Sequence, residues 1–302
     1  MATTVGFISE KGGVGKTTAC YHLAVALSRF EVKNVMVVDT DYQRGGLTCR
    51  MFPSKIEAFR TGKVADVTLF DKFERLYGGV SEEPKSVDVL RAAGKFWSWG
   101  LAVIPADSRL ADVSTNQLPP TKNVQDGARK RWNHLKLIDD VLSQFRRSFD
   151  YILIDTHPEL SDLLSSVVYA CDYCVSPVKL DQQSSIGVPS AMEAIVMVNK
   201  DMEWICSALK DIDEYKPTQF AGAIAMMARE YRGGLKESER SQYAMLKRTC
   251  GIFESYVTEG DGLRQAAEQR CPVFDLDTPN AKKQSGQFKL LTKEFIKKCP
   301  PK

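Results

Sequence analysis

The sequence has no run of apolar residues approaching the roughly 18 to 20 that a helix needs to span a bilayer. Its N-terminus also lacks the basic and then apolar pattern of a secretory signal, so we expect a cytoplasmic protein. The 302 residues are 43% hydrophobic and 26% charged, which excludes a disordered chain, a collagen and a disulfide-stabilised miniprotein. Such a chain is long enough to bury a large core.

The cysteines are not arranged as in a metal site or a disulfide framework. Cys171 and Cys174 form a C-x-x-C pair, but the sequence has no second pair at the spacing of zinc ligands. We therefore predict reduced thiols that pack as small hydrophobic side chains. The eight positions are Cys20, Cys49, Cys171, Cys174, Cys206, Cys250, Cys271 and Cys299.

The net charge of +3 is too small to indicate a nucleic-acid-binding protein by itself. The positive charge is concentrated near the C-terminus, where residues 229–302 hold 15 Lys and Arg against 10 Asp and Glu. This asymmetry predicts either a surface for a polyanionic partner or a solvated basic helix face. The candidate cations are Arg229, Arg232, Lys236, Arg240, Lys247 and Arg248.

Short apolar runs alternate with amphipathic stretches along the chain. Strands are predicted over residues 5–9, 35–39, 101–105, 151–155, 173–178 and 221–227. Helices are predicted over residues 17–29, 135–145 and 189–198. Strands that are apolar on both faces and separated by helices favour a buried parallel sheet. We therefore predict an α/β fold with a doubly wound, mostly parallel sheet flanked by helices.

No repeat, low-complexity tract or linker divides the sequence, so we predict one domain over residues 1–302. Residues 52–96 fit the alternating pattern least and are predicted to be an excursion from the sheet. Residues 119–131 contain Pro119, Pro120 and Gly127 and predict a loop that runs into the next helix.

A glycine-rich segment, SEKGGVGKTT at residues 9–18, stands between the first predicted strand and a helix. Backbone N–H groups of such a turn point into one concavity, and the helix N-terminus adds positive potential, so the segment predicts a polyphosphate site. Lys16 would reach the β- and γ-phosphates, and the Thr17 hydroxyl would bind Mg²⁺. The predicted nucleotide-binding residues here are Lys11, Gly12, Gly13, Val14, Gly15, Lys16, Thr17 and Thr18.

Two predicted strands end in carboxylates. Asp39 and Asp41 are two residues apart on an extended segment, so their side chains point the same way. The carboxyl ends of strands in a doubly wound sheet face the ligand crevice, which favours a nucleotide site over a capping pair. Asp155 ends a wholly apolar strand in the Walker B form, and we expect it to hold Mg²⁺ or a water bound to it.

The loop departs from the usual phosphate-loop pattern, because Glu10 replaces the first glycine and Lys11 precedes two glycines. It resembles the deviant Walker A box, K-G-G-x-x-K-[ST], of the ParA/MinD family of P-loop ATPases. Residues 101–106, 171–178, 222–227, 253–255 and 272–275 also resemble that family, so the likeness covers nearly the whole chain.

The resemblance implies specific roles. Lys11 would cross a dimer interface to the phosphates held by the other subunit, making charge neutralisation depend on dimerisation. Asp41 would position the attacking water, with Asp39 assisting near Mg²⁺ and Asp155 binding the metal. Catalysis is thus assigned to Lys11, Lys16 and Asp41, the metal to Thr17, Asp39 and Asp155, and adenine to Met227 and the loop after Val257.

Some positions depart from the family pattern. Thr156, His157 and Pro158 follow the Walker B acid where the family has two prolines, and His157 is predicted either to form local hydrogen bonds or to approach the γ-phosphate. Thr258 replaces a proline expected beside the base, and Gly262 replaces an expected arginine.

The last helical stretch combines Phe288, Leu291 and Phe295 with lysines 289, 293, 297 and 298. It predicts either a helix docked on the sheet or a membrane-surface helix like the tail of MinD-like proteins.

The leading hypothesis is a ParA-like ATPase. It would dimerise on binding ATP and Mg²⁺, bind DNA nonspecifically and be released when a ParB-like or adaptor protein stimulates hydrolysis. The phosphate loop begins within ten residues of the start, so we expect no N-terminal helix-turn-helix domain, and we expect the protein on the nucleoid. The alternatives are a MinD-like membrane-associated positioning ATPase and, less favoured, an amidoligase-like synthetase. Absence of cysteines between Cys49 and Cys171 excludes a nitrogenase-type reductase.

Overall fold

The computed structural model describes residues 1–302 apart from 44–45, 65, 79–85, 92–100 and 213. A seven-stranded sheet lies at its centre, with strand order β3-β4-β2-β5-β1-β6-β7. Neighbouring strands pair in parallel, except for the antiparallel β3 and β4. The predicted α/β class is confirmed. The strands are β1 (Thr3–Phe7), β2 (Val35–Asp39), β3 (Leu90–Arg91), β4 (Ala102–Ile104), β5 (Tyr151–Asp155), β6 (Tyr173–Val178) and β7 (Gln219–Ala225).

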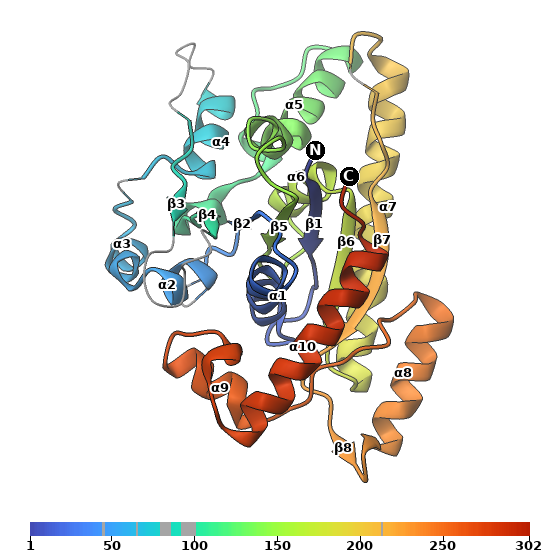
Figure 1. Ribbon diagram of the computed structural model, residues 1–302. Coiled ribbons are helices and arrows are strands. Elements are labelled where there is room, and N and C mark those ends of the chain that lie inside the picture. The colour runs from blue at the N-terminus through green and yellow to red at the C-terminus, as the bar shows by residue number, and fades with distance from the viewer. Residues whose placement is uncertain (44–45, 65, 79–85, 92–100, 213) are drawn as a thin grey trace.

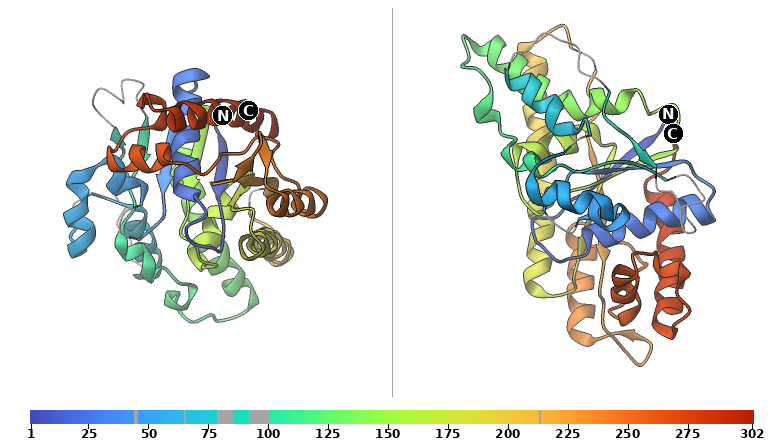
Figure 2. Two further views of the ribbon diagram at one scale, coloured as in Figure 1. Left: turned by 90° about the horizontal axis from the view of Figure 1, so that it is seen from below. Right: turned by 90° about the vertical axis from the view of Figure 1, so that its left-hand side faces the viewer.

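Helices cover both faces of the sheet (Figures 1 and 2). Alternate residues of each central strand face opposite layers: Val37 and Leu153 belong to one core cluster, Val38 and Ile154 to the other. One layer contains α1 (Lys16–Phe30), α9 (Asp261–Glu268) and α10 (Pro279–Lys298). The other contains α4 (Leu69–Gly78), α5 (Val124–Ser143), α6 (Asp162–Ala170) and α7 (Gln182–Ala208).

Toward the β3 end of the sheet lie α2 and α3, and toward the β7 end lies α8 (Figure 1). Beyond β7, α8 packs Leu246 against residues of β7 and α7. A two-stranded hairpin precedes α8. The elements are α2 (Leu47–Met51), α3 (Ile56–Thr61), α8 (Glu237–Thr249), the hairpin strands β8 (Glu230–Tyr231) and β9 (Gly234–Leu235), and the 3₁₀ turns η1 (Pro53–Lys55), η2 (Ser108–Asp112), η3 (Thr115–Gln117) and η4 (Val273–Asp275).

Several predicted boundaries were wrong. The first strand ends at Phe7, and the last spans Gln219–Ala225, both shifted by two residues from the prediction. The helix predicted at 135–145 begins at Val124, because the Asn123 side chain caps it by accepting a hydrogen bond from Asp126 N. The helix predicted at 189–198 runs from Gln182 to Ala208 with Pro189 inside it.

The cations expected around one helix occupy two elements. Arg229, Arg232 and Lys236 lie in or beside the β8–β9 hairpin, which the sequence reading missed. The helix starts only at Glu237. Gly233 occupies the left-handed region (φ 82), as a tight hairpin turn requires, and this glycine was the local signal for the hairpin.

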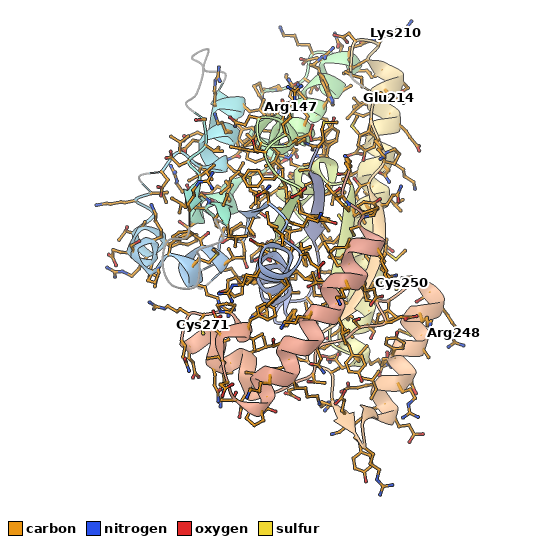
Figure 3. All side chains as sticks on the ribbon, in the orientation of Figure 1. Arg147, Lys210, Glu214, Arg248, Cys250 and Cys271 are labelled. Atoms are coloured by element: carbon orange, nitrogen blue, oxygen red, sulfur yellow. The ribbon has the colours of Figure 1, made fainter. Side chains whose placement is uncertain are left out.

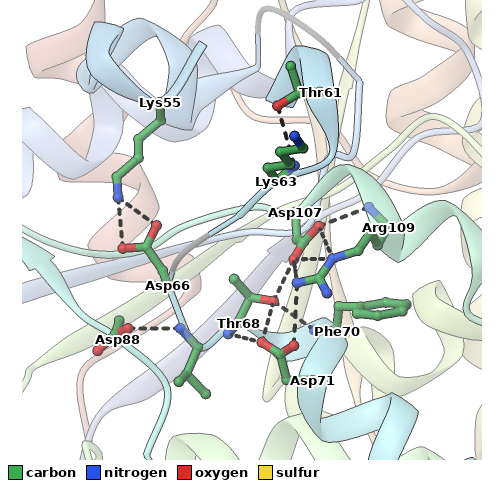
Figure 4. Close-up of polar contacts among 11 residues, drawn as sticks. Lys55, Thr61, Lys63, Asp66, Thr68, Phe70, Asp71, Asp88, Asp107 and Arg109 are labelled. Carbon is green, nitrogen blue, oxygen red and sulfur yellow. Dashed lines mark hydrogen bonds and ion pairs between the residues drawn. The ribbon is translucent and has the colours of Figure 1, made fainter. Parts of the chain in front are cut away.

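Residues 52–96, which were predicted to be an excursion from the sheet, pack against the core of the sheet where they are described. Leu69 and Phe73 of α4 are fully buried in the core that α5 also contributes to. A polar cluster joins the segment to the end of β4: the Thr68 hydroxyl donates to Asp107 Oδ2 at 2.8 Å, and the Arg109 guanidinium bonds the same carboxylate at 2.6 Å (Figure 4). Residues 79–85 and 92–100 lie outside the described residues.

The C-terminal helix α10 is docked on the sheet. Phe288, Leu291 and Phe295 are fully buried, and the lysines between them face outward or lie at the edge. This arrangement supports the docked alternative over the membrane-surface one for these three side chains. Within the described parts of the chain, no helix has the length and apolarity needed to cross a bilayer.

His22 links α1 to the C-terminal layer. Its ring stacks on Phe288 with centroids 4.7 Å apart, Nδ1 donates to the Thr18 carbonyl at 2.8 Å, and Nε2 accepts from Val273 N at 3.1 Å. Both ring nitrogens are thus satisfied only in the neutral form. Burial, reinforced by the nearby positive charge of Arg50, lowers the pKa of His22 from 6.5 to about 3.

We predict that His22 makes the fold sensitive to acid. The unfolded chain takes up a proton near pH 6.5 and the folded chain does not, so stability falls as the pH drops from about 6.5 toward about 3. Between about pH 7.5 and pH 5 the loss should be roughly 2 kcal/mol greater than in His22→Gln. Urea unfolding of both proteins at each pH measures this difference, and equal losses in the two proteins would contradict it.

Candidate functional site

The predicted phosphate loop lies between β1 and α1, at the carboxyl edge of the sheet (Figure 1). Gly13 (φ 72) and Gly15 (φ 95) both adopt left-handed backbone, which glycine reaches without steric cost. The N-cap of this 15-residue helix is Gly15, and within the described residues no side-chain hydrogen bond caps the helix start. Val14 is buried, which anchors the loop. The loop therefore has the backbone geometry of an anion cradle.

Lys16 lies under this loop. Its ammonium donates to the carbonyl oxygens of Ser9 and Lys11, both at 3.3 Å. Burial lowers the pKa of Lys16 from 10.5 to about 8, while the charges of Asp155 and Asp41 oppose that shift. A phosphate oxygen would give this buried cation a stronger acceptor than a carbonyl.

Lys11 lies on the opposite side of the loop and is bound within its own chain. Its Nζ donates to Ser184 Oγ at 3.0 Å and lies 3.7 Å from a carboxylate oxygen of Asp181, the N-cap of α7. Neither partner was predicted from the sequence. The signal for them was the D-x-x-S pattern that caps a helix start, with Ser184 N donating to Asp181 Oδ1 at 2.7 Å.

Asp39 and Asp155 end neighbouring strands in register and are both fully buried. Neither carboxylate oxygen of Asp155 has a hydrogen-bond partner of normal geometry in the described structure. Burial and the neighbouring Asp39 raise the pKa of Asp155 well above its usual value, although the nearby Thr17 hydroxyl opposes the shift. An unsatisfied buried carboxylate beside a hydroxyl is an oxygen donor set that suits Mg²⁺.

Asp39 has a structural task in addition to the metal role predicted for it. Its Oδ2 accepts bonds from Thr48 N at 2.7 Å and Thr48 Oγ1 at 2.6 Å, and Oδ1 accepts from Asp41 N at 3.1 Å. The Thr48 hydroxyl also accepts from Ala106 N at 2.9 Å, which ties α2 to the end of β4. Burial raises the pKa of Asp39 to about 6. Its metal ligation stays a prediction.

Asp41 is the most open of the three acids. Its Oδ1 accepts from Gln43 N at 3.0 Å, and burial raises its pKa, opposed by that bond and by the nearby His157 and Lys16. The structure thus brings Asp39, Asp41 and Asp155 together, as the strand ends predicted, and Lys16 lies close to Asp41 and Asp155. Within the described ranges, no group of three or more His, Cys, Asp or Glu could hold a metal alone. Mg²⁺ held by one or two carboxylates plus phosphate and water fits that finding.

His157 does not form the local hydrogen bonds that were one of its two predicted roles. Its ring stacks on Tyr42 with centroids 4.0 Å apart, and neither ring nitrogen has a hydrogen-bond partner in the part of the chain described. The Glu159 carboxylate lies 3.6 Å from Nδ1. Burial lowers the pKa of His157, which favours the neutral ring.

A cavity of about 620 Å³ opens where adenine was predicted. Met227 lines it with left-handed backbone (φ 54), together with Thr258, residues 259–261, Leu263 and Arg264. The two departures from the family pattern at Thr258 and Gly262 have structural reasons. Thr258 donates its N–H to Gln287 of α10 at 3.0 Å, and a Cβ at Gly262 would lie 2.7 Å from Ala281, so the close approach of α9 and α10 requires glycine.

The C-x-x-C pair is structural. Cys171 and Cys174 are buried, and all eight cysteines are free thiols. An added Cβ on Gly6 would lie 3.1 and 3.3 Å from the two sulfur atoms, so the pair packs directly on the β1 backbone. The sulfurs act as packing atoms.

We predict that Thr48→Val loosens the base of this site. The substitution removes a donor to Asp39 and an acceptor for Ala106 N, leaving buried polar groups unsatisfied, so the free energy of unfolding should fall by about 2 kcal/mol. Thr249→Val, at an exposed hydroxyl on α8, should cost well under half of that. Denaturant unfolding of the three proteins makes the comparison, and an equal effect of both variants would refute it.

Comparisons with known proteins agree with this geometry. A family model described as an AAA domain matches residues 2–207. A ParA family protein of Chlamydia muridarum is 29% identical over 180 residues, 58% of each chain, so the match spans little more than half of that relative. The sporulation initiation inhibitor protein Soj of Bacillus subtilis is 26% identical, covering 67% of this chain and 68% of Soj.

Among solved structures, apo McdA of Cyanothece superposes with a TM-score of 0.70 at 19% identity, covering 96% of this chain and 99% of McdA. At that identity the likeness concerns the fold. The match to more than half of the chain decides the family, and the loop, the strand-end carboxylates and the sheet order agree with it. The chain belongs to the ParA/MinD family of P-loop ATPases.

Proposed function

We propose that this protein is a ParA-like partition or positioning ATPase that dimerises on binding ATP and Mg²⁺. The observation that carries the proposal is one constellation: a glycine-rich loop whose Lys16 lies beside the strand-end carboxylates Asp41 and Asp155, with a second lysine, Lys11, held by the start of α7. Similarity to ParA family proteins and Soj supports the same general function.

In this proposal the triphosphate lies along the loop, against the backbone N–H groups at the start of α1 and the Lys16 ammonium. Adenine occupies the cavity lined by Met227, Thr258 and Leu263. Thr17 and Asp155 hold Mg²⁺, which shields the phosphate charge when bound, and Asp39 keeps the neighbouring segment in place.

Hydrolysis is assigned to Asp41 and Lys11. Asp41 is partly open to the crevice, so its carboxylate can orient a water molecule toward the γ-phosphate. Lys11 would neutralise charge on the nucleotide of a second subunit, and to do so it must leave Ser184 and Asp181 of its own chain. These contacts support weak hydrolysis by the isolated chain, with a ParB-like or adaptor protein stimulating it.

We predict that Asp41→Ala separates binding from hydrolysis. The variant should bind ATP and form ATP-dependent dimers, while its hydrolysis rate falls by about a hundredfold or more because the water is no longer oriented. Phosphate release and light scattering measure the two properties. Lys16→Ala is the matched control and should lose ATP binding itself. Loss of dimerisation in Asp41→Ala would rule out the role assigned to Asp41.

Nonspecific DNA is the proposed platform, and α8 with its hairpin is the proposed contact surface. Arg232, Lys236, Lys247 and Arg248 are exposed there, and Arg248 points away from the body of the molecule (Figure 3). Arg229 is engaged with Glu239 through both its N–H and its side chain, so we leave it out of the surface. Exposed cations of this kind track phosphates without reading sequence. This platform implies a nucleoid-associated protein.

We predict that Lys247→Ala with Arg248→Ala weakens ATP-dependent DNA binding equally on unrelated sequences. Each lost phosphate contact should reduce the salt dependence of log K by about 0.9, so the slope should fall by about 2. Arg147→Ala with Lys210→Ala removes the same charge from exposed positions far from α8 and serves as control (Figure 3). Fluorescence anisotropy over a salt series measures the slopes. ATP-dependent binding to anionic liposomes without DNA binding would instead support the MinD-like alternative.

A further inference from the structure

A second cavity, of about 610 Å³, lies on the other side of the phosphate loop, lined by residues of α2, α3 and α9. It meets the predicted adenine cavity only at Thr18 and Ala267 among the lining residues of the described structure. No motif in the sequence predicted this second cavity. Its volume lies in the range of small-molecule sites.

The base of this cavity contains an unusual arginine. Arg50 Nε is buried without a hydrogen-bond partner in the described ranges, and the guanidinium makes one long bond, 3.5 Å, to the Cys271 carbonyl. Its carbon lies 4.4 Å above the Tyr21 ring. None of the ion pairs between described residues includes Arg50. A largely buried cation without a counter-charge is costly unless an anion joins it.

The other charges of the lining leave the cavity positive. Arg60 and Arg270 join Arg50, and Asp41 supplies one negative charge. Arg60 is engaged with Glu57 through two bonds of 2.9 and 2.6 Å, both exposed to solvent. Arg270 is exposed at the end of α9. Among the described residues, Arg50 Nε has no hydrogen-bond partner, and Arg270 is open to solvent, so both guanidinium forks can donate to an anion. Arg forks suit phosphate.

Part of the lining is apolar. Phe59 is buried and Ile56 is 43% exposed, and both line the cavity beside Cys49. A lining that combines charged donors with aromatic and aliphatic side chains fits a ligand that has both an anionic and an apolar part.

We propose that this cavity binds an organic phosphate, with its phosphate at Arg50 and Arg270 and its apolar part against Ile56 and Phe59. The arginine and apolar part of the cavity borders the predicted nucleotide site without belonging to it, and the inference does not depend on ATP hydrolysis. Because the cavity also touches Thr17 and Asp41, a ligand there would lie beside the predicted metal and water positions.

Phenyl phosphate and inorganic phosphate are the probes, titrated by calorimetry into the whole chain with saturating ADP and Mg²⁺ and again without nucleotide. Bound ADP occupies the phosphate loop, so any remaining site is a different one. Phenyl phosphate should bind saturably in both conditions, and inorganic phosphate more weakly.

Arg50→Met should weaken phenyl phosphate binding about ten- to a hundredfold while leaving ADP affinity unchanged. Ile56→Ser should weaken phenyl phosphate and leave inorganic phosphate unchanged. Arg270→Met, at an exposed position, tests the phosphate end without disturbing the core, and Arg147→Met is the remote control.

Three results would overturn the proposal. The first is an absence of saturable binding in both conditions. The second is loss of phenyl phosphate binding when ADP is present. The third is an equal loss of ADP and phenyl phosphate affinity in Arg50→Met, which would assign Arg50 to the nucleotide site.

Discussion

The structure at the carboxyl edge of the sheet depends on how the buried carboxylates there are stabilised. Asp39 and Asp155 end the adjacent strands β2 and β5, Asp41 follows β2, and Lys16 lies close enough to Asp41 and Asp155 that these charges shift its pKa. Three carboxylates near one ammonium leave an excess of negative charge in a region largely removed from water. The Thr48 bonds stabilise one carboxylate, the Gln43 N–H stabilises another, and Asp155 remains unsatisfied. A divalent cation with phosphate oxygens would complete this balance.

The sheet puts these groups together because its strands are parallel and in register. Asp39 pairs directly with Asp155 across β2 and β5, and the loop after β1 leads into α1 beside them. Opposite layers then hold the two lysines differently. Lys16 belongs to α1 in one layer, whereas Lys11 is bound by the start of α7 in the other. Any movement of Lys11 toward a second subunit thus breaks a contact with α7.

Two cavities flank the loop, and their linings differ in character. The one near Met227 lies between the end of β7 and the start of α9, where α10 packs so closely that Gly262 cannot carry a side chain. The other lies toward α2 and α3 and contains the uncompensated Arg50. They share Thr18, at the start of α1. A ligand in either cavity therefore lies next to the same helix N-terminus.

Local patterns in the sequence determined the α/β class, the central strands, the phosphate loop and the strand-end acids. Each depends on periodicity or spacing within about ten residues, which backbone sterics constrain directly. The boundaries of α5 and α7 were not predicted, since capping by Asn123 and packing outweighed the local signals of proline and glycine. The hairpin before α8 was missed although Gly233 provided a local signal for it. Only the tertiary structure decided that Lys11 meets Ser184, that Asp39 holds Thr48 and that Phe288 is buried on His22. It also decided that Arg50 has no ion-pair partner among the described residues and that its Nε has no hydrogen-bond partner there. These contacts, or their absence, depend on the packing of separate elements, many of them distant in the chain, which no local pattern encodes.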